Sequence, residues 1–163
     1  KLLVLTFVRP GELRAATWRE FDIAGRIWRI PAERMKMKVE HLVPLSTQTI
    51  ELLAMLKEIN RREDLLFPCV TNRDKAMSDN TMRQAIFRLG YDGKTAGKSK
   101  AVPHGFRATA SSILNEVGFN PDAIERQLSH QERNGVRAAY THHARYMEDR
   151  TKMMQFWSDY LYQ

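Results

Sequence analysis

Strand-forming sequence occupies one short stretch of this chain, residues 18–46, and the periodicity of the remaining sequence is helical. Arg26 to Ile30 alternates polar and apolar side chains, and Val39 to Leu45 is rich in β-branched and apolar residues. Ala24-Gly25 provides a turn beside the first of these strands, so neighbouring strands can pair antiparallel. We therefore predict a mainly α-helical domain with a small antiparallel β-sheet, an α+β fold.

Helix start and stop signals divide the rest of the chain. Ser46 is a favourable N-cap for the amphipathic segment TIELLAMLKEI, which ends near Asn60. Residues 120–122, Asn-Pro-Asp, give an N-cap, a proline and an acid in the order that favours a helix start. The other predicted helices lie at residues 2–8, from residue 12, from Ser78 or Asp79 to Gly90, from Pro103 to Gly118, and from Met147 to Tyr162.

Length and charge limit the class of protein. The 163 residues suffice for one domain with a hydrophobic core, and the start within an apolar helical run predicts a piece of a longer protein. Lys and Arg number 26 against 19 Asp and Glu, so the formal net charge of +7 favours an anionic partner, nucleic acid or an acidic membrane surface. No apolar run approaches the roughly 18 residues of a membrane span, so a cytoplasmic protein is expected.

His104 and Arg107 are one helical turn apart in the stretch HGFR, directly after Pro103. Residues three apart lie on one face of a helix, and the amides at a helix start also favour an anion. The pair therefore suits a phosphate, although a surface pair without function would have the same spacing.

Two basic loops are predicted beside these elements. The loop between the later strands would project Arg34, Lys36 and Lys38, because it forms the tip of a hairpin. The glycine-rich loop GYDGKTAGKSK would be the most mobile segment. Its Lys94, Lys98 and Lys100, together with Lys38, are candidate DNA contacts.

Four stretches in a fixed order resemble the catalytic domain of tyrosine recombinases, in particular prophage-type integrases. They are TFVRPGELRAATW, MKMKVEHLVPLS, HGFR and QLSHQERNGVRAAYTHH. The resemblance covers nearly the whole chain, and the ordered series is more specific than any member. It implies six catalytic residues: Arg9, Lys36, His104, Arg107, His130 and Tyr140.

The resemblance also implies a role for each position. Arg9 and Arg107 would clamp the scissile phosphate, and Tyr140 would be the nucleophile, with Tyr146 as second choice. His130 lies in Leu-Ser-His where the family usually has Leu-Gly-His, and would donate a hydrogen bond to the phosphate. Lys36 falls where the family's hairpin lysine lies, although Lys38 could substitute if the turn is built differently.

These residue types suit phosphodiester cleavage on chemical grounds. Guanidinium groups hold the charge that builds on the phosphate oxygens, and they do not deprotonate. A tyrosine hydroxyl with a pKa of about 10 needs a nearby base, for which His104 is the candidate. A lysine on a mobile loop can protonate the leaving 5′-oxygen.

No metal or other cofactor is expected, because a phosphotyrosine bond conserves the energy of the broken phosphodiester. His142 and His143 are adjacent in sequence, and adjacent helical residues point about 100° apart and cannot chelate one ion together. Glu12, three residues after Arg9, would orient that arginine or a helix start. The apolar stripe of the last helix would pack in the core or dock on a partner protomer.

The resemblance implies double-stranded DNA attachment sites as partner, a homotetramer on DNA in the full-length protein, and an accessory directionality factor. The family's N-terminal core-binding and arm-binding domains are absent from residues 1–163, so this catalytic-domain fragment is expected to bind DNA weakly and with strong salt dependence. The predicted activity is site-specific DNA recombination through a 3′-phosphotyrosine. Alternatives are relaxation of DNA by a type IB topoisomerase and a non-catalytic basic DNA-binding module.

Overall fold

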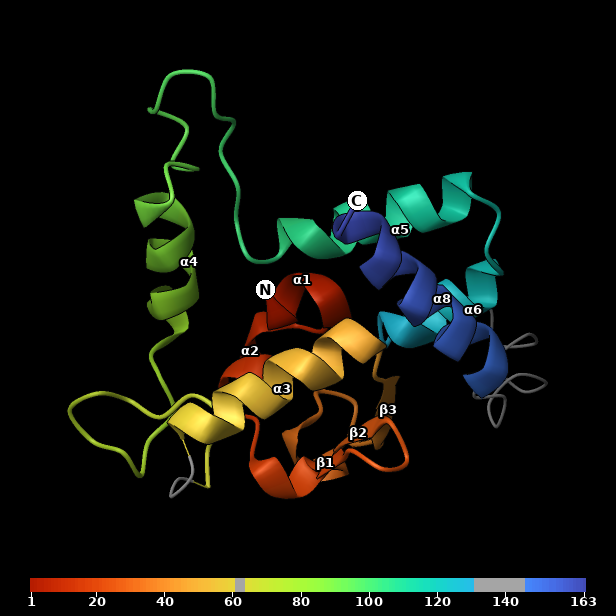
Figure 1. Cartoon of the computed structure of the whole chain (residues 1–163), viewed down its shortest axis with the longest axis horizontal. Coiled ribbons are helices and arrows are strands. Elements are labelled where there is room, and N and C mark those ends of the chain that lie inside the picture. Colours follow the sequence, from red (N-terminus) through yellow and green to blue (C-terminus); the bar gives the residue numbers. More distant parts are fainter. Residues whose placement is uncertain (61–63, 131–145) are drawn as a thin grey trace.

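The computed structural model describes residues 1–60, 64–130 and 146–163, and its described part is a set of short helices around a small sheet (Figure 1). The helices are α1 (Leu2–Thr6), α2 (Pro10–Arg14), α3 (Thr47–Ile59), α4 (Asp79–Arg88), α5 (Gly105–Glu116), α6 (Pro121–Gln127) and α8 (Met147–Leu161). The strands are β1 (Phe21–Asp22), β2 (Ile27–Ile30) and β3 (His41–Pro44). The predicted α+β fold is therefore confirmed.

The sheet is antiparallel in the order β1-β2-β3, as the alternating sequence predicts. Trp28 on β2 lies opposite Phe21 of β1 and Val43 of β3, and its ring stacks on Phe21 with 4.9 Å between centroids. The side chain of Trp28 is fully buried, and its Nε1 donates to the Glu20 carboxylate. This strand therefore supplies the centre of the core beneath the sheet.

Predicted caps fix the ends of several helices. The Ser46 hydroxyl accepts from the backbone N–H of Thr49 at the start of α3, which ends at Ile59. The Asn120 side chain accepts from the N–H of Asp122 at the start of α6. Gly118 follows α5 with a φ of +86°, a conformation that favours glycine. These boundaries agree with the sequence signals.

Two clusters of buried apolar side chains meet at the chain segment after α1. Val8 belongs to the cluster under the sheet, which includes Trp28 and Leu53. Phe7 belongs to the cluster among α5, α6 and α8, where it meets the Trp157 ring edge-on. Arg9 follows these two residues, so the junction between the two clusters positions the first candidate catalytic residue.

Helix α8 packs its apolar stripe inward, as one of the two sequence interpretations predicts. Met153, Met154 and Trp157 are buried in the second cluster, whereas Phe156 and Leu161 are exposed. Docking of the exposed part on a partner protomer stays a prediction. Within the described residues, no helix has both the length and the apolar character that a membrane crossing requires.

The prediction that Arg34 projects from the hairpin tip is wrong. A short 3₁₀ helix at Ala32–Arg34 turns the side chain inward, where it donates to the Glu20 carboxylate and to the backbone carbonyl of Glu12. The buried carboxylate attracts the guanidinium, and the neighbouring Met35 is itself buried. Lys36 and Lys38 remain exposed, as predicted.

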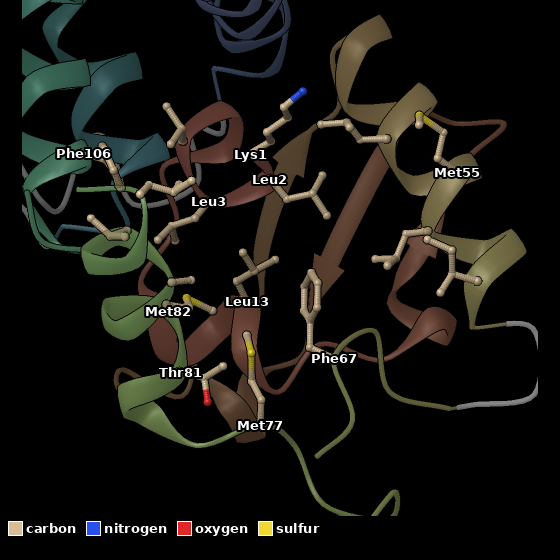
Figure 2. Close-up of a pocket in the computed structure, with 17 residues that line it drawn as sticks. Lys1, Leu2, Leu3, Leu13, Met55, Phe67, Met77, Thr81, Met82 and Phe106 are labelled. Atoms are coloured by element: carbon tan, nitrogen blue, oxygen red, sulfur yellow. The ribbon is translucent and has the colours of Figure 1, made fainter. Parts of the chain in front are cut away.

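An apolar cavity of about 550 Å³ lies between α1, α3 and α4 (Figure 2). Its described lining is mainly aliphatic and sulfur-containing side chains, such as Leu13, Met55 and Met82. None of the five candidate catalytic residues that the structure describes contributes to that lining. The charged residues that the structure describes are therefore separate from this cavity.

Candidate functional site

Arg9 lies at the junction between α1 and α2, where it is the N-cap of α2. The Glu12 carboxylate binds it twice: Oε2 accepts from the backbone N–H of Arg9 at 2.9 Å, and Oε1 accepts from Nη1 at 2.8 Å. Glu12 is buried, whereas Arg9 keeps 28% of its side chain exposed. The predicted role of Glu12 in orienting Arg9 is thus confirmed.

Arg107 projects from α5 into the molecule, with only 4% of the residue exposed. Its Nη1 donates to the carbonyl of Phe7 at 2.7 Å, and its Nη2 donates to the carbonyl of Leu128 at 2.5 Å. Burial, followed by the charge of Arg9, lowers the pKa of Arg107 to about 10. The guanidinium therefore stays charged near neutral pH, within a mostly buried setting.

The two arginines meet at the end of α6. Arg9 Nη2 donates to the carbonyl of Ser129 at 2.9 Å, and Arg107 holds the carbonyl of Leu128, the preceding residue. Two guanidinium groups on consecutive carbonyls repel each other, in agreement with the lowered pKa of Arg107. An anion bound between them would offset that repulsion, so the arrangement fits phosphate.

Backbone conformations in the left-handed region mark both arginine contacts. Phe7, whose carbonyl accepts from Arg107, has a φ of 36°, and Ser129, whose carbonyl accepts from Arg9, has a φ of 52°. Such conformations are costly for residues other than glycine, by about 1–2 kcal/mol each. A glycine at position 129 would adopt this positive φ without that cost.

His130 follows directly on these carbonyls and is 47% exposed. Its Nδ1 lies 2.8 Å from the Glu125 carboxylate, and its backbone N–H donates to the carbonyl of Glu125. Since a carboxylate accepts only, Nδ1 carries the proton. The Glu125 contact thus fixes the ring through Nδ1, and Nε2 is the ring nitrogen left to face a phosphate.

His104 occupies the N-cap position of α5, one turn before Arg107. The two residues share that helix start as the sequence predicts, but His104 is exposed whereas Arg107 is buried. An exposed imidazole at this place is accessible to a substrate. The role of His104 as base stays a prediction.

The loop lysines lie on exposed segments outside the arginine cluster. Lys36 and Lys38 are in the connection between β2 and β3, and the Lys38 ammonium donates to the carbonyl of Glu33 at 3.2 Å. In the glycine-rich loop, Lys98 donates to the carbonyl of Leu89 and lies over the Tyr91 ring. Lys94 and Lys100 are exposed there. Contacts of these lysines with DNA stay predictions.

Tyr140, the candidate nucleophile, lies outside the described residues, as do His142 and His143. The second-choice tyrosine, Tyr146, is described at the start of α8, where its hydroxyl donates to the Asp122 carboxylate at 3.4 Å. In the described part of the chain, no group of three or more His, Cys, Asp or Glu side chains could hold a metal ion.

Sequence reasoning missed a buried polar layer beneath the arginines, formed by His41, Gln127 and Arg150. His41 Nε2 lies 3.1 Å from the carbonyl of Gln127, and the Gln127 side chain accepts from Arg150. Burial, followed by the charge of Arg150, lowers the pKa of His41 to about 3. The one available signal was a histidine at the start of an otherwise apolar strand, which alone does not reveal its partners.

Comparison with protein families and known proteins gives consistent results. Residues 1–146 match the model of the phage integrase family. The chain is 49% identical to the integrase of Enterobacteria phage P4 across 99% of this chain and 39% of that protein. It is 40% identical to the prophage integrase IntA of Escherichia coli across 96% of this chain and 36% of that protein. The chain thus spans about two fifths of the length of these curated relatives.

Solved structures share the fold. The crystal structure of XerA recombinase aligns with a TM-score of 0.64 at 20% identity, over 87% of this chain and 56% of that one. The Tn1549 transposon integrase, solved in complex with transposon right end DNA, aligns with a TM-score of 0.61 at 16% identity, over 93% of this chain and 56% of that one.

Proposed function

The chain belongs to the phage integrase family of tyrosine recombinases, and from that membership we propose that it is the catalytic domain of a site-specific DNA recombinase. The observation that carries the proposal is the convergence of Arg9 and Arg107 on the consecutive carbonyls of Ser129 and Leu128. Side chains that are about 100 residues apart in sequence form one cationic cluster there, beside His130. Such a cluster fits the charged transition state of phosphoryl transfer.

The reaction begins with attack by the Tyr140 hydroxyl oxygen on a DNA phosphorus. A Tyr140 oxygen–phosphorus bond forms, the bond from phosphorus to the 5′-oxygen breaks, and the DNA retains a 3′-phosphotyrosine. His104 takes the tyrosine proton, and Lys36, or Lys38 in its place, gives a proton to the leaving 5′-oxygen.

The second half of the reaction reverses these steps with a different strand. The 5′-hydroxyl of the partner strand attacks the phosphotyrosine, which releases Tyr140 and joins the exchanged strands. Each step makes one phosphate ester and breaks one, so the cycle needs no external energy source. Integration or excision of a mobile element is the outcome when the two strands belong to paired sites.

The proposed partners follow from this cycle. Strand exchange needs two double-stranded attachment sites, each cut on both strands, and hence four active sites in a homotetramer. An accessory directionality factor would select integration or excision. The Tn1549 transposon integrase was solved in complex with DNA, and the net charge of +7 of this chain supports the same class of partner. The proposed setting is the DNA of a bacterial host, in its cytoplasm.

Covalent capture of DNA tests the proposal without knowledge of the attachment site. The protein is incubated with supercoiled plasmid at low salt, quenched with denaturant, and the DNA retained on protein is measured. We expect adduct with wild type and with Tyr146→Phe, and none with Tyr140→Phe. Adduct that persists in Tyr140→Phe would contradict the assigned nucleophile. Exchange between paired sites, which a type IB topoisomerase does not require, then separates recombination from relaxation.

A further inference from the structure

Three successive carbonyl groups at the end of α6 accept hydrogen bonds from three other elements. The carbonyl of Gln127 pairs with His41 Nε2 on β3, that of Leu128 with Arg107 on α5, and that of Ser129 with Arg9 before α2. Carbonyls in the last turn of a helix lack partners within the helix, so outside donors fix the position of this end. His41 is the one donor of the three that belongs to neither the arginine pair nor the other candidate catalytic residues.

The hydrogen bond of His41 has a defined direction. A carbonyl oxygen accepts only, so Nε2 of His41 must carry the proton in this contact. Burial holds the pKa of His41 at about 3, so the imidazole is neutral near neutral pH and Nδ1 has no proton. A neutral, singly protonated His41 is therefore a fixed donor and not a proton carrier.

The side chain of Gln127 extends the same contact to two further elements. Its Nε2 donates to the carbonyl of Thr6 at the end of α1, and its Oε1 accepts from Arg150 Nε and Nη2 on α8. Arg150 Nη2 also donates to the carbonyl of Leu42, next to His41 on β3. Gln127 is fully buried and Arg150 nearly so. Buried hydrogen bonds thus join the end of α6 to β3, α1 and α8.

Along the chain, this layer lies one residue before each acceptor of Arg107 and two residues before the acceptor of Arg9. Gln127 precedes Leu128 and Ser129, and Thr6 precedes Phe7, whose carbonyl is the other acceptor of Arg107. A shift of the Gln127 backbone would therefore move the acceptors of Arg107 and Arg9, and the start of the segment that bears His130. Figure 1 shows α6 and α8 together beside β3, in agreement with these bonds.

We infer that His41 is a positioning residue for DNA cleavage, which sets the end of α6 through Gln127 and thereby the places of Arg9, Arg107 and His130. This inference rests on the proposed recombinase function for its catalytic consequence. The structural part of the inference is that the positions of the arginines depend on the His41 donor. This part can be tested without measuring activity.

Two substitutions of His41 separate donation from packing. His41→Gln keeps an N–H donor near the place of Nε2, whereas His41→Leu fills space without a donor. Ser158→Ala is the matched control, because it removes a buried hydrogen bond between α8 and Ser46, a bond in which no residue of α6 takes part. With saturating plasmid DNA, we expect His41→Leu to slow adduct formation more than about tenfold at unchanged DNA affinity. His41→Gln and Ser158→Ala should stay within about threefold of wild type.

Nuclear magnetic resonance of the arginine Nε–Hε groups gives a readout that does not need activity. We expect the signals of Arg9 and Arg107 to shift in His41→Leu and to stay in place in Ser158→Ala. Unshifted arginine signals, or a His41→Gln protein as slow as His41→Leu, would overturn the inference. If wild type forms no adduct, the proposed function fails, and the arginine signals alone decide the positioning role.

The wild-type protein offers a second measurement in case His41→Leu does not fold. Imidazole nitrogen chemical shifts report which ring nitrogen is protonated. We expect the proton of His41 on Nε2, as donation to the carbonyl of Gln127 requires. A proton on Nδ1 would overturn the inference.

Discussion

The side chain of Arg107 has a structural role and a proposed catalytic role. It is buried and bonded to two carbonyls, of Phe7 and Leu128, so it joins α5 to the ends of α1 and α6. It is also the second arginine of the proposed phosphate clamp. The spacing of His104 and Arg107 indicated a shared helix start, but the sequence could not reveal that Arg107 is buried, because its partners are backbone atoms distant in the chain.

Replacing Arg107 by lysine keeps the charge but removes the planar guanidinium group, whose Nη1 and Nη2 donate to two different carbonyls. We expect Arg107→Lys to reduce adduct formation by about 100- to 1,000-fold, since one ammonium cannot hold both carbonyls and the phosphate. One carbonyl left without a partner should also lower the free energy of unfolding by about 1–3 kcal/mol.

The matched control for this substitution is Arg14→Lys, because Arg14 also donates to a carbonyl, that of Met77, outside the cluster. It should retain adduct formation. The role of Arg107 in the clamp is contradicted if Arg107→Lys cleaves DNA as fast as Arg14→Lys.

At the scale of elements, local signals predicted most boundaries. Ser46 and Asn120 cap α3 and α6 through their own side chains, and such caps depend on residues close in sequence. Arg34 shows where local reasoning fails, because its inward turn depends on Glu20 and on the carbonyl of Glu12, which only the folded chain brings near. The layer of His41, Gln127 and Arg150 was missed for the same reason.

The burial of His41 on β3 should make stability depend on pH. The pKa of His41 is lowered from 6.5 to about 3 in the folded protein. Between these two pH values, His41 therefore binds a proton in the unfolded chain but not in the folded one. The free energy of unfolding is therefore unaffected by the protonation of His41 above about pH 6.5, and it decreases as the pH falls from there toward 3. Between about pH 7.5 and about pH 5, we expect wild type to lose about 2 kcal/mol more than His41→Gln.

Denaturant unfolding of both proteins at the two pH values checks this expectation. The comparison removes the contribution of the other titrating groups, because they are common to both chains. Equal losses in wild type and His41→Gln would show that His41 is not buried in its neutral form.

The whole molecule places its charged site where two apolar clusters meet. Phe7 and Val8 belong to different clusters, and Arg9 follows them, so packing of both halves fixes the arginine pair. The family resemblance and the mainly helical class were predictable from the sequence, since both depend on ordered local motifs. The convergence on the end of α6 was not, because it arises from contacts about 100 residues apart, such as that between Phe7 and Arg107.

The most direct test of the account is the identity of the tyrosine that becomes attached to DNA. Trypsin would separate the two candidates, since cleavage after Arg137 and Arg145 gives one peptide with Tyr140 and another that starts at Tyr146. After adduct formation and digestion of the DNA by nuclease, mass spectrometry should find a nucleotide remnant on the peptide of residues 138–145. A remnant on the peptide that starts at Tyr146, or on neither peptide of an adduct-forming protein, would contradict the assignment of Tyr140 as the nucleophile.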